Sequence, residues 1–141
     1  MEFAVALAAK GKFTAKPNPV VGCVIVNNNE IVGQGYHQNY GGNHAEINAI
    51  ENACHKISNY RLINASIYCT LEPCHMCASA IIHARISNLY YGASDMENEE
   101  LQNKYKSFAE NKNLKIDIYP SINEKKCSDL LINFFKSKRT K

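Results

Sequence analysis

The stretch "SIYCTLEPCHMCASAIIHARISNLYYGA", Ser66–Ala93, contains the clearest signal of the overall architecture. Residues 66–71 are a short apolar run typical of a strand, and residues 74–86 repeat apolar side chains at helical spacing. Residues 87–93 form a second strand-like run. A helix that joins two strands of one sheet makes a parallel crossover. This stretch therefore predicts an α/β fold.

The segments on either side continue the alternation of helices and strands. Residues 19–37 are two β-branched runs around the Asn-rich turn "NNNE", which predicts a β-hairpin, and residues 114–119 alternate as a strand does. The expected helices cover residues 1–10 (ending at Gly11), 44–57, 74–86, 96–112 and 123–138. With helices on both faces, we expect a three-layer α/β/α sandwich around a five-stranded mixed sheet, as one domain over residues 1–141.

Composition and charge limit the setting in which the protein works. The chain has 141 residues, and none of its apolar runs approaches the roughly 20 residues that span a bilayer. The N-terminus, "MEFAVALAAKGKF", does not read as a secretory signal, so we expect a cytoplasmic protein without membrane contact. The net charge is +3, and the positive charges gather in "FFKSKRTK", residues 134–141. Such a tail can contact phosphate or simply lie solvated.

Six cysteines are present, and in a reducing compartment they favour metal binding or burial over disulfides. Two of them, Cys74 and Cys77, have the C-x-x-C spacing of metal ligands. The remaining cysteines lie in apolar or amphipathic surroundings, where a thiol is expected to pack as a small buried side chain. These are Cys23, Cys54, Cys69 and Cys127.

A metal centre is predicted where two helices begin. Cys74 and Cys77 stand at the start of one predicted helix, and their spacing places both sulfurs on the same side. The positive end of the helix dipole favours thiolates there by about 0.3–1 kcal/mol. His44 begins the preceding helix, and one imidazole with two thiolates suits zinc. Three other side chains are poorly placed to add a fourth ligand: Cys69, His75 and His83.

Three protein ligands and an open position are typical of a catalytic zinc site. Glu46 follows His44 closely and would bring a carboxylate to that position. Zinc lowers the pKa of water to about 7, so that a nearby carboxylate can take its proton and pass it to a substrate. Taken alone, Glu46 would be interpreted as an acidic residue in the first turn of a helix, where the helix dipole favours negative charge. Beside the predicted zinc ligands, it is predicted to act as a general acid–base.

The motifs "HAE" (His44–Glu46) and "PCHMC" (Pro73–Cys77) resemble the H-x-E and P-C-x-x-C signature of the zinc-dependent nucleobase deaminases. The resemblance extends over nearly the whole chain, and it implies a sheet of the cytidine deaminase type. It also implies that Glu46 shuttles protons while water replaces an exocyclic amine of the base and ammonia leaves. The Zn2+ ligands that it implies are His44, Cys74 and Cys77.

The second half of the chain is similar to the tRNA adenosine deaminases, which convert the wobble adenosine of certain tRNAs to inosine as homodimers. The similarity lies in "TLEPCHMCASAIIHARISNLYYGASD" (70–95) and in "KKCSDLLINFFKSKR" (125–139). It implies a tRNA anticodon loop as partner, a homodimer, and a basic closing helix beside the phosphate backbone. Substrate binding would then weaken as salt increases.

The first half is more similar to the pyrimidine deaminase domain of riboflavin synthesis, through residues 6–26 and 33–46. In that family, the residues that correspond to Asn18 and His37 help to hold the substrate. The tRNA enzymes usually carry Asn where His37 stands. The pyrimidine deaminases, in turn, have a longer, lysine-containing insertion between the cysteines, where this chain has only "HM".

Other functions remain open at the level of sequence. The substrate can instead be a free nucleobase, nucleoside or nucleotide. A structural zinc module that binds RNA without chemistry would need a fourth protein ligand and would not need Glu46. An inactive partner subunit would typically lack this glutamate, which the chain keeps. The sequence therefore predicts a deaminase more firmly than it predicts the base.

Overall fold

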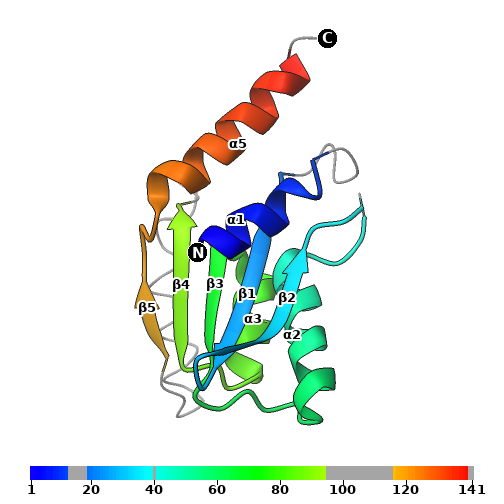
Figure 1. The fold of residues 1–141 in the computed structure, drawn as a ribbon, viewed down its shortest axis with the longest axis vertical. Helices are drawn as coiled ribbons and strands as arrows, with labels where there is room; N and C mark the ends of the chain where they lie inside the picture. Colours follow the sequence, from blue (N-terminus) through cyan, green and yellow to red (C-terminus); the bar gives the residue numbers. More distant parts are fainter. Residues whose placement is uncertain (13–18, 40, 95–115, 140–141) are drawn as a thin grey trace.

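The centre of the protein is a five-stranded mixed sheet in the order β2-β1-β3-β4-β5 (Figure 1). The computed structural model describes residues 1–12, 19–39, 41–94 and 116–139. The strands are β1 (Gly22–Asn27), β2 (Glu30–Tyr36), β3 (Ser66–Leu71), β4 (Asn88–Ala93) and β5 (Asp117–Tyr119). β1 runs antiparallel to both β2 and β3, whereas β3, β4 and β5 run parallel to one another. The mixed sheet and the parallel crossover from β3 to β4 are thus confirmed.

Helices cover both faces of this sheet. They are α1 (Glu2–Ala9), α2 (Ala45–Ile57), α3 (His75–His83) and α5 (Glu124–Arg139). α1 and α5 lie on one face, and α2 and α3 lie on the other (Figure 1). The three-layer α/β/α sandwich is therefore confirmed. The helix predicted at 96–112 and the first part of the strand predicted at 114–119 lie outside the described residues.

The predicted hairpin is confirmed, and its turn explains the Asn-rich sequence. β1 and β2 are joined through Asn28 and Asn29, whose φ angles are 52° and 63°. A two-residue type I′ turn requires positive φ at both positions, and Asn tolerates this region better than most residues. The resulting register pairs Gly22 with Tyr36. The end of β2 therefore lies beside the start of β1.

The larger hydrophobic core lies between the sheet and the layer formed by α2 and α3. Its fully buried side chains include Ile25 from β1, Ile67 from β3 and Ile81 from α3. α2 turns small residues toward the sheet, and β2 carries glycines opposite them. A Cβ atom at Gly35 would lie only 2.5 Å from the carbonyl oxygen of Ala45. This close approach of two backbones sets the position of the first turn of α2.

Gly35→Ala is expected to destabilise the protein by about 1–3 kcal/mol, because the added methyl group would collide with backbone atoms. The nearest are the oxygen of Ala45 at 2.5 Å and the nitrogen of Ala49 at 2.6 Å. Urea unfolding measures the change. Gln34→Ala alters an exposed side chain of the same strand and should stay within about 0.5 kcal/mol of the wild type. Equal losses in both variants would contradict the close-packing argument.

Two helix ends depart from the commonest local patterns. α1 ends at Ala9, and Gly11 follows it without the left-handed conformation expected of a glycine after a helix. The missing side chain of Gly11 instead leaves room for the backbone carbonyl of His37. Pro73 lies before the N-cap of α3 and not in its first turn, because Cys74 is extended, with ψ of 174°.

The cysteine predictions are largely confirmed. Cys23, Cys69 and Cys127 are fully buried, whereas Cys54 near the end of α2 is only half-buried. Among the described residues, no helix combines the length and apolar character that a bilayer crossing requires.

Candidate active site

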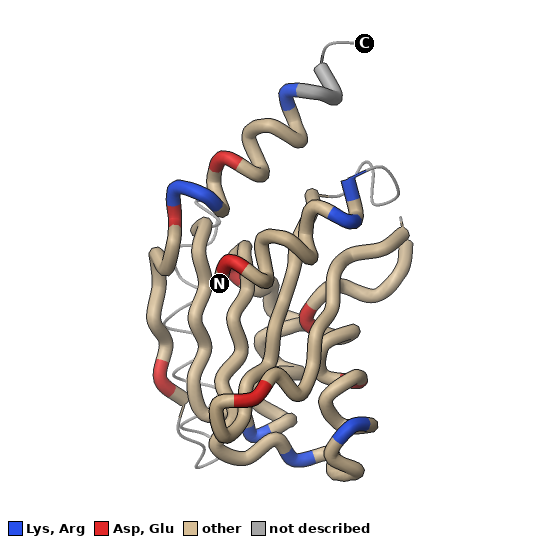
Figure 2. The backbone as a smooth tube through the Cα atoms, in the orientation of Figure 1, with Lys and Arg blue, Asp and Glu red and all other residues tan. Residues whose placement is uncertain are grey.

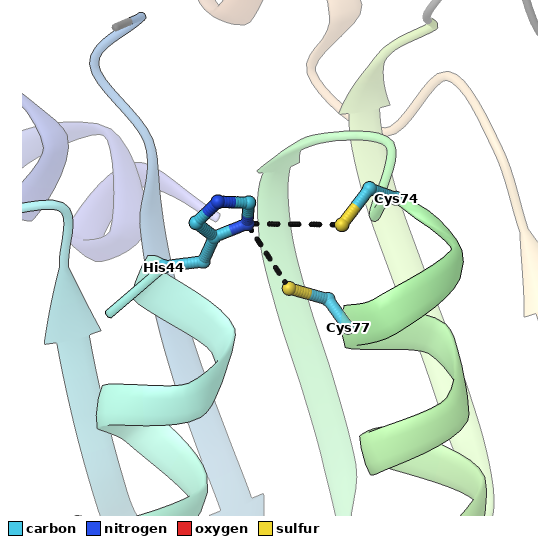
Figure 3. Close-up of side chains that lie close together, drawn as sticks. All are labelled: His44, Cys74 and Cys77. Carbon is cyan, nitrogen blue, oxygen red and sulfur yellow. Dashed lines mark hydrogen bonds between the residues drawn. The ribbon is translucent and has the colours of Figure 1, made fainter. Parts of the chain in front are cut away.

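Two helix N-termini meet at one edge of the sheet. β2 and β3 run in the same direction, since each is antiparallel to β1, so both strands end at this edge. The chain leads from β2 to α2, whose N-cap is His44, and from β3 to α3, whose N-cap is Cys74. Figure 3 shows His44 at one helix start pointing toward Cys74 and Cys77 at the other. The sheet topology thus brings the predicted zinc ligands together.

The three side chains form a compact group of potential metal ligands, with donor atoms within 4.8 Å of one another. The Nδ1 atom of His44 lies 3.7 Å from the Sγ atom of Cys74 and 3.4 Å from that of Cys77. Tetrahedral zinc, with Zn–N and Zn–S bonds of about 2.0 and 2.3 Å, separates such donors by about 3.5 Å. Both the donor types and their spacing therefore fit zinc.

The two sulfurs differ in how readily they lose a proton. A hydrogen bond from the thiol of Cys77 lowers the pKa of Cys74 to about 5. The same hydrogen bond raises the pKa of Cys77. The N-terminal end of α3 adds its partial positive charge to the thiolate. Zinc coordinates thiolates, and its binding therefore releases the remaining proton.

Within the described part of the chain, no fourth protein ligand joins this group. His75 and His83 are exposed on α3, and Cys69 is buried within β3. Three ligands with an open coordination position form the arrangement of catalytic zinc sites, whereas structural sites are closed by a fourth ligand. The geometry therefore favours chemistry over a purely structural role.

Glu46 brings a buried carboxylate to the same place. It lies in the first turn of α2, and only 4% of its surface is exposed. Burial raises the pKa of Glu46. A carboxyl group with a raised pKa can both accept and donate a proton near neutral pH. The side chain thus has the environment of a general acid–base.

A pocket of about 200 Å³ opens beside these residues. Its walls include the apolar side chains of Val21 and Leu71, and its polar groups include Glu46 and the predicted substrate ligand His37. His37 is only 4% exposed. Its Nδ1 atom lies 3.2 Å from the carbonyl oxygen of Asn43, and because a carbonyl only accepts, Nδ1 carries the proton in this contact. The structure therefore brings His37 to the site.

Two further residues bear on the site: Asn18, which was predicted to bind substrate, and Glu72, which was not. Asn18 lies outside the described residues, although the neighbouring Pro19 lines the pocket. Glu72, which was not among the predicted site residues, also lines the pocket and is 7% exposed. Its backbone N–H donates a hydrogen bond to the carbonyl of Ala93 at 2.8 Å, which ties the end of β3 to β4. In the sequence it is a single acid between a strand and Pro73, without a distinctive spacing.

A buried carboxylate beside an incomplete His/Cys/Cys zinc group, at the strand ends of an α/β/α sandwich, defines a class of zinc-dependent hydrolases. The pattern of the cytidine and deoxycytidylate deaminase zinc-binding region matches residues 1–93, and the chain belongs to this family. It is therefore a zinc-dependent aminohydrolase that acts on a C–N bond.

Relatives within the family include enzymes with two different substrates. The chain is 44% identical over 124 residues to a tRNA-specific adenosine deaminase of Buchnera aphidicola (subsp. Baizongia pistaciae), covering 84% of this chain and 76% of the relative. It is 38% identical over 146 residues to a diaminohydroxyphosphoribosylamino-pyrimidine deaminase of Buchnera aphidicola (subsp. Schizaphis graminum), covering 99% of this chain and 94% of the relative.

The similar solved structures also include both a pyrimidine deaminase and a tRNA deaminase. A bifunctional pyrimidine deaminase and uracil reductase of Thermotoga maritima matches with a TM-score of 0.82 and 30% identity over 99% of this chain, which spans only 40% of that protein. A tRNA:A34 deaminase, solved in a study of wobble-position A-to-I editing, matches with a TM-score of 0.75 and 31% identity. That match covers 93% of this chain and 97% of the deaminase. The cytidine deaminase fold is thus confirmed.

Proposed function

We propose that this chain deaminates adenosine to inosine at the wobble position of tRNA, with Glu46 as the proton shuttle. The observation that carries the proposal is the burial of the Glu46 carboxylate in the pocket beside the three-donor group. The proposed zinc ligands are His44, Cys74 and Cys77. Relatives that are tRNA-specific adenosine deaminases match most of this chain and support the choice of substrate.

In this proposal the protein side chains manage protons while the exocyclic amine is replaced. Zinc, when bound, supplies a Lewis acid that lowers the pKa of water to about 7. Glu46 accepts a proton from the attacking water and delivers it to the ring nitrogen beside the reacting carbon. It then supports protonation of the departing amine. A C–O bond forms and the C–N bond breaks, so adenosine and water become inosine and ammonia.

The pocket walls support recognition of a base in this proposal. Val21 and Leu71 offer apolar surface to the faces of a nucleobase, whereas His37 offers an imidazole to its polar edge. Enzymes that act on a base inside a folded nucleic acid turn that base out into such a pocket. A wobble adenosine lies in a single-stranded loop, where this movement costs little.

The proposed partner is the anticodon loop of tRNA, and the proposed assembly is a homodimer in the cytoplasm, with residues 1–141 acting as one domain. Lys10 is the C-cap of α1, Lys12 follows it in the next turn, and Lys136 lies in α5. Figure 2 marks the Lys and Arg positions along the backbone. Lysines near the phosphate backbone would make binding weaken as salt increases. The side chains of the basic tail beyond Lys136 lie outside the described residues.

A second candidate is deamination of the riboflavin-pathway pyrimidine. The position of His37 favours it, because this side chain lines the pocket and the resemblance to the pyrimidine deaminases assigns substrate binding to it. A pyrimidine deaminase is also 38% identical over 99% of this chain.

A two-substrate assay separates the candidates. The zinc-loaded protein is incubated with an unmodified tRNA that carries a wobble adenosine and, separately, with the riboflavin-pathway pyrimidine. We expect inosine in the tRNA digest by mass spectrometry and no ammonia from the pyrimidine. Ammonia from the pyrimidine without inosine would contradict the proposal and support the second candidate.

The variant His37→Asn gives a second way to distinguish the two candidate substrates in the same assay. Because the tRNA enzymes usually carry Asn at this position, the variant should keep its activity on tRNA within about tenfold, a change of 1.4 kcal/mol in the barrier. If the pyrimidine were the substrate, the variant should lose more than that. Gln38→Asn, at the exposed neighbouring position, is the matched control.

A further inference from the structure

A buried thiol contacts the carboxylate of Glu46 from the side of the sheet. Cys23 lies on β1, is fully buried, and points its Sγ atom at Oε1 of Glu46 over 3.5 Å. Cys23 does not line the pocket, so it meets the carboxylate from behind and not from the substrate side. Any effect of this thiol on a substrate must therefore pass through Glu46.

Two thiols lie close to this carboxylate, and they differ in their other partners. The single S–H proton of Cys77 is directed to the sulfur of Cys74, and Cys77 belongs to the group of potential metal ligands. Cys23 is outside that group and lies within hydrogen-bond distance of Oε1. Among the described residues, Cys23 is therefore the thiol placed to donate to Glu46 whether or not a metal is bound.

The surroundings of Cys23 keep its proton available. Burial raises the pKa of Cys23 well above its ordinary value, so it stays a thiol. Its Sγ atom lies 3.3 Å from that of Cys69, its direct partner across β1 and β3. The single proton of Cys23 therefore has two acceptors in reach, the Cys69 sulfur and the Glu46 carboxylate, and the charged carboxylate oxygen is the stronger acceptor.

We propose that Cys23 is a positioning residue for the reaction: its thiol holds Oε1 of Glu46 and thereby keeps the carboxylate turned toward the pocket. The neighbouring strand and helix make this contact rigid, because Cys23 is in mid-sheet and Glu46 is in the first turn of α2. The role assigned to Glu46 rests on the proposed function, whereas the hydrogen bond itself does not.

Cys23→Ala and Cys23→Ser separate positioning from packing. A hydrogen bond to a charged group, made here by a weak donor, predicts that kcat of Cys23→Ala falls about tenfold with KM within about twofold. Cys23→Ser keeps a donor and should retain kcat within about threefold of the wild type. Packing alone predicts the reverse order, because serine buries a hydroxyl in an apolar core. Equal kcat values for both variants, or an unchanged Cys23→Ala, would overturn the proposal.

Cys127→Ala is the matched control, because it removes the same atom from a fully buried cysteine of α5 that packs against β4. It should leave kcat and zinc content unchanged. Zinc content should also stay near one ion per chain in both Cys23 variants, since Cys23 is outside the three-donor group.

An infrared measurement tests the hydrogen bond without any substrate. The S–H stretching band that disappears in Cys23→Ser should shift to higher frequency in Glu46→Gln, because an amide oxygen accepts more weakly than a carboxylate. A band that does not respond would overturn the proposal even if the variants fold poorly. If the band responds but the wild type deaminates neither test substrate, the proposed function fails and the hydrogen bond stands.

Discussion

Glu46→Gln is expected to bind about one zinc ion per chain and to lose deamination by about 10²–10⁴-fold, the usual contribution of general acid–base catalysis. The amide cannot take a proton from water, but it has nearly the same shape as the carboxyl group. Zinc should stay bound because Glu46 is not among the three donor atoms that lie within 4.8 Å of one another. Metal analysis and turnover of the tRNA substrate measure the two effects.

Glu51→Gln is the matched control for this variant, because it makes the same chemical change at an exposed position of the same helix. It should behave as the wild type. Full activity of Glu46→Gln would remove the proton-shuttle role and would favour a zinc module that binds RNA without chemistry. Loss of zinc in Glu46→Gln would instead place the carboxylate in the metal site.

Cys77→Ala should lose both zinc and activity, because it leaves two of the three donors. In the wild type, zinc at about 100 times its dissociation constant should add about 2.7 kcal/mol of stability. For a chain of 141 residues, this corresponds to a melting temperature higher by about 6–10 °C. The variant should gain nothing from added zinc. Metal analysis and thermal unfolding with and without zinc measure these changes.

Two comparisons make the thermal result specific. Cys54→Ala removes a half-buried thiol from α2, outside the metal-ligating group, and should keep the zinc-dependent increase. A chelator should lower the melting temperature of the wild type toward its zinc-free value and leave Cys77→Ala unchanged. A zinc-dependent increase that survives in Cys77→Ala would show that the metal binds elsewhere.

The candidate site was largely predictable from sequence, because its residues belong to short local motifs. The spacing of Cys74 and Cys77 needs only one helical turn to place both sulfurs together. The pairing with His44 follows from the position of both motifs at helix starts. Glu72 was missed because a lone acid after a strand has no distinctive spacing. Its burial at the pocket is a property of the folded chain.

Some local conformations were also not predictable, because they depend on contacts that exist only in the folded chain. A glycine after a helix usually takes the left-handed conformation, but Gly11 serves another purpose, since the carbonyl of His37 occupies the space of its missing side chain. The contact joins residues far apart in sequence. Pro73 likewise lies outside the first turn of α3, because Cys74 is extended at the point where the helix begins.

By itself, the sequence determined the alternation of helices and strands, the donor types and the carboxylate, because periodicity and motif spacing are local properties. The tertiary structure alone decided that β2 and β3 end at the same edge, that Glu46 is buried, and that Cys23 contacts it. These features depend on strand order and on the close packing of α2, which bring distant segments into contact. No local pattern encodes that juxtaposition, since it arises only when the sheet is assembled.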